Sequence, residues 1–280
     1  MRSPFAGDVV TYFAAQNRGS RDVHTEPVVA AGFHRGRACH HHPACRMRRR
    51  GGGSTAQPVA GTTFPVQAAI AKLYATGFEN NVIISGTLTG SSGTSPVSGA
   101  AVYTRYKALA ATFNGQSAYA TTRTINTTIT TENGQAIQPI SLTFQRTTFL
   151  SASYAPAGAE VGNGICVPQT PSTYPTTVTL GPNGAAVSGA VVTYACVSTT
   201  SPSVPLGTES ISFKLAPGNS SNTATLTIFD NRFDTSGTAD GSRQTTYSID
   251  TTGNMSFLSE SGNDWNTTTG VLGNLTFTAQ

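Results

Sequence analysis

Apolar and polar residues alternate with a period of two through most of the chain after residue 80, and this pattern is typical of β-strands with one buried face. The clearest case is 116–131, where Arg123, Ile125 and Ile129 occupy the same phase of the alternation. Asn133-Gly134 then predicts a two-residue hairpin, because both residues tolerate the positive φ of a type I′ turn. Strands are predicted at 81–89, 101–110, 116–131, 140–144, 176–180, 187–197, 210–215, 223–229, 244–249, 255–259 and 275–278.

One segment follows a helical period instead. Val66, Ile70, Leu73 and Tyr74 would share one face of a short helix over 66–75, and Gly77 lies just beyond its end as a candidate C-cap. This is the one convincing helix that the pattern predicts.

About ten strands with short polar turns predict an all-β fold, either an antiparallel sandwich or a curved meander. Abundant threonine suits strands with one wet face, since the hydroxyl meets water while the methyl group packs. We expect a disordered segment at 1–50, a Gly/Ser/Pro linker at 51–64 and a β-rich domain at 65–280. The proline-rich run at 168–175 would either divide this domain or form one long loop.

Composition changes abruptly near residue 50. All five histidines lie before residue 43, and nine of the 17 basic residues, all arginine, lie before residue 51. From residue 53 onward the chain has eight basic and ten acidic residues and no histidine. The net charge of +4 therefore belongs to the first fifty residues. Such a break is typical of a tail, a targeting segment or an artefact.

Two interpretations take this basic segment as it is printed. Thiolate and imidazole groups at 39–45 (Cys-His-His-His-Pro-Ala-Cys) are suitable ligands for Zn²⁺ or Cu²⁺, but no second Cys/His pair follows at zinc-finger spacing. The arginines at 46–50 would form an arm that neutralises phosphate, although no aromatic residue or glutamine accompanies them to read bases.

A third interpretation is that 1–50 is an out-of-frame translation. A one-base shift turns the codons of Met47 and a CGN-encoded Arg48 into a cysteine codon, and residues 44–46 then permit Leu-Ala-Ala before it. The preceding codons become mostly apolar, and a Met start is permitted about twenty-five codons upstream, a usual signal-peptide length. The alternative is a genuine basic tail whose other frame is apolar by accident.

The shifted frame resembles the lipobox and signal peptide of a bacterial cell-envelope lipoprotein. Residues 51–58 (Gly-Gly-Gly-Ser-Thr-Ala-Gln-Pro) are similar to the tether that follows the acylated cysteine in such proteins. The resemblance implies a lipid anchor in the membrane and a place on the outer membrane, facing the periplasm or the exterior. In the printed frame the chain has neither the signal peptide nor a cysteine at the acylation point.

Cys166 and Cys196 are the only cysteines of the predicted domain. A disulfide between them would close a loop of about thirty residues and stabilise the fold by roughly 3 kcal/mol in the loop-entropy model. An envelope compartment favours this bond, and two reduced, buried thiols are the alternative.

Several enzyme classes are excluded for the domain. Without a histidine after residue 42, neither a Ser-His-Asp nor a Cys-His arrangement can form there. No Gly-x-Ser-x-Gly, Walker-type or dinucleotide-binding motif is present. We therefore predict no catalytic residue and no cofactor, because the glutamates lie in separate segments and give no carboxylate pair: Glu79, Glu132, Glu160, Glu209 and Glu260.

Two local features are candidate sites. Asp230, Asp234 and Asp240 lie in one oxygen-rich segment that would hold Ca²⁺, although EF-hand spacing is absent and Asp with Gly is also ordinary turn chemistry. Trp265, the single tryptophan, lies in a predicted polar loop, where it would bind a sugar or a partner or fold back over the core.

These observations predict a non-enzymatic cell-envelope lipoprotein with a structural or binding role, for which protein, glycan and apolar ligands all stay open. No nucleic-acid partner is expected for the domain. A first alternative is a carrier or chaperone that holds an apolar ligand in a curved sheet, by architectural resemblance to lipoprotein-carrier half-barrels. A dry apolar cavity would favour that carrier. A second alternative is an extracytoplasmic hydrolase, which requires a converging acid pair.

Overall fold

The computed structural model describes residues 9–10, 61–90, 93–161, 164–170, 173–200, 202–266 and 272–280. All of these belong to one compact unit, whereas the second unit, Ala15–Ser54, lies outside the described residues. The predictions of a metal site at 39–45, a basic arm at 46–50 and a signal peptide therefore also lie outside them. No helix in the described part of the chain has the length and apolar character needed to cross a membrane.

Strands dominate this unit, as the alternation predicts, and the expected helix is confirmed as α1 (Val66–Thr76). A short 3-10 helix, η1, covers Pro182–Gly184. The strands are β1 (Val9–Val10), β2 (Thr63–Phe64), β3 (Phe78–Gly90), β4 (Gly93–Arg105), β5 (Leu109–Phe113), β6 (Gln116–Glu132), β7 (Gln135–Leu150), β8 (Pro156–Val161), β9 (Gly164–Pro168), β10 (Val178–Thr179), β11 (Val187–Ser198), β12 (Pro205–Pro217), β13 (Thr223–Phe233), β14 (Ala239–Asp250), β15 (Met255–Asn266) and β16 (Leu272–Ala279).

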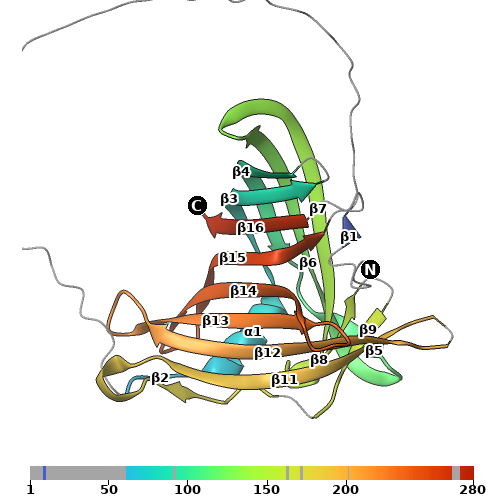
Figure 1. Cartoon of the computed structure of the whole chain (residues 1–280). Helices are drawn as coiled ribbons and strands as arrows, with labels where there is room; N and C mark the ends of the chain where they lie inside the picture. The colour runs from blue at the N-terminus through green and yellow to red at the C-terminus, as the bar shows by residue number, and fades with distance from the viewer. Residues whose placement is uncertain are drawn as a thin grey trace, which may run out of the picture. The chain divides into compact units, whose positions relative to one another are not determined.

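Twelve of these strands close into an antiparallel barrel, so the all-β class is confirmed and the expected sandwich or curved meander is wrong. The hydrogen-bonded order is β7-β8-β9-β11-β12-β13-β14-β15-β16-β3-β4-β6, and β6 pairs with β7 to complete the ring (Figure 1). The last strand pairs with the first long one, with Phe277 opposite Ile84. Alternation along a strand predicts which face is buried, but it carries no information on which distant strand lies alongside.

The remaining strands are accessory. β5 pairs with β6, and β1 pairs with β7 at Gln145 and Phe144. β2 and β10 form a separate two-stranded ladder. Closure of the ring depends on two short strands, since β8 reaches β7 only at 148–150 and β9 connects β8 to β11.

Local turn chemistry agrees with the sequence. Asn133 and Gly134 have φ values of 50° and 75°, as the hairpin between β6 and β7 requires. In β3, Gly86 sits so close to β16 that a Cβ atom would lie 2.1 Å from the carbonyl oxygen of Asn274. A side chain there would push the two strands apart, so the glycine permits the tight approach that the curved sheet needs.

The barrel interior is filled from two directions. One apolar cluster joins Ile70 of α1 to inward side chains of β12, β13 and β14, such as Leu215, Leu226 and Ile249. Tyr174, at the end of the proline-rich run, is buried in this cluster too. A second cluster contains Ile84, Ile125, Phe144 and Phe277 from β3, β6, β7 and β16. Each such side chain contributes about 1.5–3 kcal/mol on burial.

The C-terminal end of α1 is fixed against β4. Gly77 caps the helix by donating its N–H to Leu73 O, with a φ of 67°, as the sequence predicts. A Cβ atom on Gly77 would lie 2.5 Å from the carbonyl oxygen of Arg105. The backbone N–H of Ala108 also donates to Tyr74 O at 2.8 Å. Helix and strand therefore meet closely at Arg105, the residue from which the site is built.

Candidate binding site inside the barrel

Three arginines form a row across the inner wall of the barrel. Arg105, Arg123 and Arg146 come from the adjacent strands β4, β6 and β7, and they stand directly opposite one another in the sheet register. All three are at least nine-tenths buried. Like charges opposite one another destabilise a sheet, so this arginine row requires negative charge nearby.

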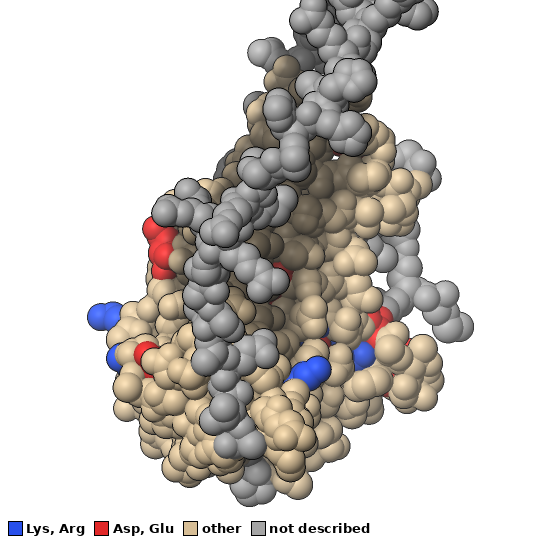
Figure 2. Space-filling model, turned by 90° about the vertical axis from the view of Figure 1, so that its left-hand side faces the viewer, with Lys and Arg blue, Asp and Glu red and all other residues tan. Residues whose placement is uncertain are grey.

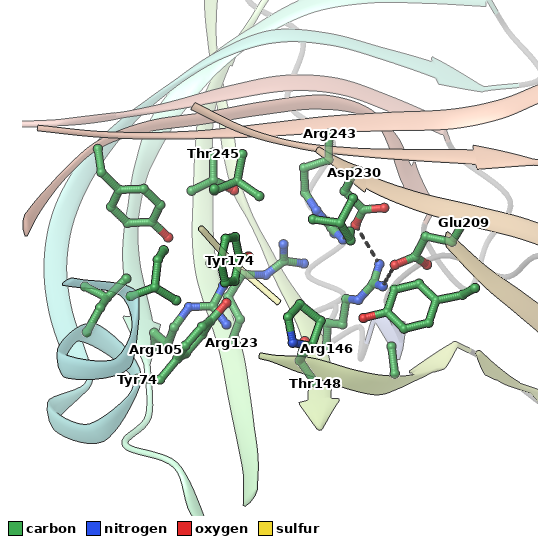
Figure 3. A pocket seen from close by; sticks show the side chains of 18 residues that line it. Tyr74, Arg105, Arg123, Arg146, Thr148, Tyr174, Glu209, Asp230, Arg243 and Thr245 are labelled. Carbon is green, nitrogen blue, oxygen red and sulfur yellow. Dashed lines mark hydrogen bonds and ion pairs between the residues drawn. The ribbon is translucent and has the colours of Figure 1, made fainter. Parts of the chain in front are cut away.

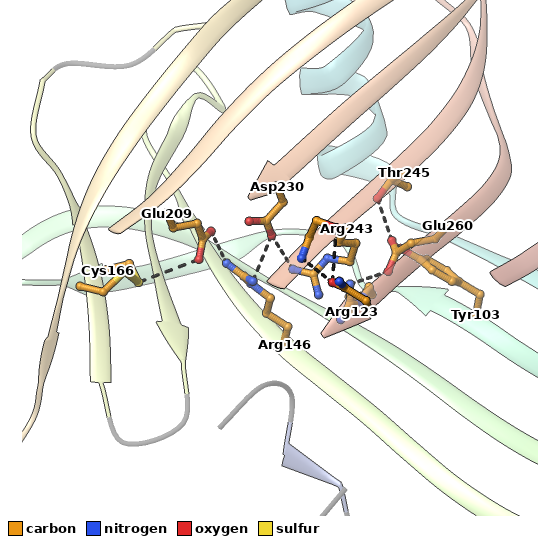
Figure 4. Close-up of polar contacts among 12 residues, drawn as sticks. Tyr103, Arg123, Arg146, Cys166, Glu209, Asp230, Arg243, Thr245 and Glu260 are labelled. Carbon is orange, nitrogen blue, oxygen red and sulfur yellow. Dashed lines mark hydrogen bonds and ion pairs between the residues drawn. A yellow bond between two sulfur atoms is a disulfide. The ribbon is translucent and has the colours of Figure 1, made fainter. Parts of the chain in front are cut away.

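The middle member of the row finds a carboxylate from across the barrel. Arg123 Nη1 donates to Glu260 Oε1 at 2.6 Å (Figure 4). The other oxygen of Glu260 accepts hydrogen bonds from Tyr103 Oη at 2.7 Å and from Thr245 Oγ1 at 2.8 Å. Glu260 is fully buried, and these partners satisfy both of its oxygens.

Arg146 binds two carboxylates at once. Its Nη1 donates to Asp230 Oδ2 at 3.1 Å, and its Nη2 donates to Glu209 Oε1. Arg243 Nη2 also donates to Asp230 Oδ2, at 2.6 Å. Burial raises the pKa of Glu209 above its ordinary value. Burial also opposes ionisation of Asp230, but Arg146 and Arg243 overcome this and hold its pKa well below the usual range.

Arg105 differs from both neighbours. Its guanidinium makes no hydrogen bond or ion pair within the described residues, and its Nε is buried without a partner. Its guanidinium lies over the ring of Tyr74 in a cation–π contact, with Cζ 5.4 Å from the ring centroid. The side chain is nevertheless only 8% exposed.

A cavity lies between α1 and the arginine row. It offers about 80 Å³ to the centres of water-sized molecules, and Figure 3 shows the row along it, with Tyr74 and Tyr174 beside Arg105. Tyr194 and Tyr247 line it as well. Burial raises the pKa of Tyr174, Tyr194 and Tyr247, so these phenols stay protonated and can donate hydrogen bonds.

No protein-family model, curated protein or solved structure matches this chain.

The three aspartates that suggested a calcium site do not form a ligand set. Asp230 points into the barrel and binds two arginines. Asp234 lies in the β13–β14 turn and accepts hydrogen bonds from Ser236 and Thr238. Within the described residues, the one group that approaches metal-ligand geometry is Cys166, Cys196 and Glu209. Its two sulfurs are bonded to each other and offer no thiolate.

The predicted disulfide between Cys166 and Cys196 is confirmed. It joins β9 to β11 at directly opposite positions. Cys166 Sγ also lies 4.0 Å from Glu209 Oε2, so the bond borders the Arg146 end of the row. Trp265 lies in β15 opposite Gly273, rather than in a loop, and its side chain is outside the described part of the structure.

Proposed function

We propose that this protein is a non-enzymatic cell-envelope lipoprotein whose barrel binds a small ligand in the cavity between α1 and the arginine row. The observation that carries the proposal is this cavity, in which a few guanidinium and phenol groups converge among apolar side chains. Small-molecule sites have this composition. A space of about 80 Å³ is large enough for several waters and therefore for a ligand of only a few heavy atoms.

Two observations support the envelope location. Disulfides persist in oxidising compartments such as the periplasm, and Cys166–Cys196 joins two strands of the barrel itself. The shifted reading frame supplies the signal peptide and the acylated cysteine. Resequencing the DNA across the codons for 47–53 tests the anchor. A one-base change that restores Leu-Ala-Ala-Cys is the expected result, and an unchanged sequence would overturn the lipid anchor.

Binding in the cavity is tested with a pair of variants on β7. Thr148 lines the cavity, whereas Thr147 faces the neighbouring strand and pairs with Thr122 at 3.4 Å. Native mass spectrometry of the purified full chain should show a small bound molecule in the wild type and in Thr147→Phe. It should be lost in Thr148→Phe, because the ring fills the space. Equal occupancy of both variants would place the ligand elsewhere and overturn the proposal.

The cavity does not have the dry apolar lining that a carrier of apolar ligands requires. Arg105, Arg123 and Arg146 all border it. An apolar ligand there would remove water from these charges without replacing its hydrogen bonds, which is unfavourable. The face in Figure 2 is mostly neutral, with scattered Lys, Arg, Asp and Glu side chains, while the charged residues that border the cavity are buried.

A hydrolase is the second candidate, because Glu209 and Asp230 converge on Arg146. Their pKa values are displaced in opposite directions, as in pairs that divide acid and base roles. Against this role, each carboxylate is already bound by a guanidinium. Chromogenic glycosides and esters test it: turnover by the wild type that disappears in Glu209→Gln would replace the binding proposal, and no turnover by the wild type supports binding.

A further inference from the structure

One position of the arginine row has no ion-paired carboxylate in the described part of the chain. Arg123 binds Glu260, and Arg146 binds Glu209 and Asp230. Arg105 occupies the third place in the same register and has no carboxylate among the described residues. Two arginines of the row are therefore paired with carboxylates, and the one that borders α1 is not paired within the described residues.

The charge balance inside the barrel agrees with this local observation. The buried charged residues in the described ranges are five arginines and three carboxylates: Arg105, Arg123, Arg146, Arg232, Arg243, Glu209, Asp230 and Glu260. An arginine remains charged when it is buried, and an isolated buried charge is strongly unfavourable. Among the described residues, buried guanidinium groups thus outnumber buried carboxylates, and Arg105 borders the cavity.

The phenol groups around Arg105 can donate hydrogen bonds but carry no negative charge. Tyr174 and Tyr247 line the same cavity, and their hydroxyls make no hydrogen bond within the described residues. Both phenols stay protonated because burial raises their pKa. A guanidinium together with two O–H donors matches a group that has several oxygen acceptors and a negative charge.

We propose that the ligand is a small oxyanion, of the carboxylate or phosphate class, that binds Arg105 through its guanidinium and accepts hydrogen bonds from Tyr174 and Tyr247. This inference rests on the proposed function, since it names the chemical class that the cavity binds. The oxyanion takes the place that Glu260 has at Arg123, and the size of the cavity restricts it to a few heavy atoms.

The test compares charged and neutral probes of the same shape on the full chain. Acetate and acetamide form one pair, and inorganic phosphate is the third probe; all are titrated by calorimetry at constant ionic strength. We expect heat of binding from at least one oxyanion and none from acetamide. Acetate and phosphate are separate arms, so their relative affinity identifies the class. Acetamide binding as tightly as acetate would overturn the inference.

Variants assign the binding to Arg105. Arg105→Met should weaken oxyanion binding at least tenfold, and Arg105→Lys, which retains the charge but not the planar fork, should weaken it less. Lys107→Met is the matched control, because it removes one positive charge from an exposed position two residues away and should bind as the wild type does. Circular dichroism checks that each variant folds. Equal affinities for Arg105→Met and Lys107→Met would overturn the inference.

Failure of this inference is distinguishable from failure of the proposed function. A neutral molecule that occupies the wild type and is excluded by Thr148→Phe would preserve the cavity as a binding site and overturn its anionic ligand. An oxyanion that binds Thr148→Phe as tightly as the wild type would overturn both.

Discussion

The two ends of the arginine row use the same side chain on neighbouring strands but meet opposite surroundings. At the Arg146 end, the chain supplies carboxylates from β12 and β13, and the disulfide lies beside them. At the Arg105 end, it supplies the phenols of Tyr174 and Tyr247 and the end of α1, beside the cavity that runs along the whole row. The difference suggests two roles for one residue type. The arginines that are paired with carboxylates have a structural role, whereas Arg105 is the position proposed to bind an anionic ligand.

The largest expected effect comes from four buried tyrosines: Tyr174, Tyr194 and Tyr247, which line the cavity, and Tyr103. Burial raises all four pKa values, whereas the unfolded phenols ionise near pH 10. The unfolded state therefore loses protons first, and their contribution is complete below pH 10 and lost above it. Urea unfolding should show stability falling by up to about 5 kcal/mol per pH unit. Phenolate absorbance that rises near pH 10 without unfolding would contradict this.

Removing Arg146 should cost nearly as much. Arg146→Met leaves Glu209 and Asp230 buried without the guanidinium that joins them, a change that typically costs about 3–5 kcal/mol. Arg105→Met is the matched comparison, because it removes a buried charge that forms no ion pair with any described carboxylate. In ligand-free protein it should leave the free energy of unfolding nearly unchanged or raise it. Equal losses in the two variants would eliminate the distinction between the two ends.

The disulfide should contribute an intermediate amount at the Arg146 end. Replacing both Cys166 and Cys196 with alanine removes a cross-link between positions 30 residues apart. Loop entropy predicts a loss of about 3 kcal/mol. Urea unfolding of the variant, beside the wild type with and without reductant, measures it. If the double variant is as stable as the oxidised wild type, the bond does not constrain the unfolded chain.

The smallest effect should fall on the Arg105 end. In Gly77→Ala the new Cβ would lie 2.5 Å from Arg105 O, and the backbone would have to keep a φ of 67°, which together cost about 1–3 kcal/mol. Gly237→Ala is the control, since Gly237 has a φ of 83° but open space around it. The difference between their unfolding free energies isolates the steric contact, and its absence would show that helix and strand can separate freely.

Local features of the fold are largely readable from the sequence, and closure is not. The helix over 66–75 and the Asn133-Gly134 hairpin follow from short-range chemistry, and the structure confirms both. The alternation predicts neither β8 nor β9, because Pro156–Val161 and Gly164–Pro168 are short and rich in small residues. These two strands complete the ring. Because the alternation marks the long strands but not β8 and β9, the sequence predicts a sheet that is not closed.

The sequence contains a weaker signal for the site, in the strand phase of two arginines. Arg123 shares the strand phase of Ile125 and Ile129, and Arg146 shares that of Phe144, so each charge occupies a position expected to be buried. Such positions indicate an internal charged network. The partners could not be assigned, because Glu209, Asp230 and Glu260 lie far along the chain and reach the arginines only across the closed barrel.

Pairing of β16 with β3 also determines when the barrel can form. The two strands lie at opposite ends of the described domain, so the last seam must wait until the C-terminal strand has left the ribosome. Contacts between such distant residues slow folding, because the chain loses loop-closure entropy before the stabilising contacts form. A nascent chain would thus remain open until β16 has been made. Loss of the final eight-residue strand should abolish the seam and leave β3 with an exposed edge.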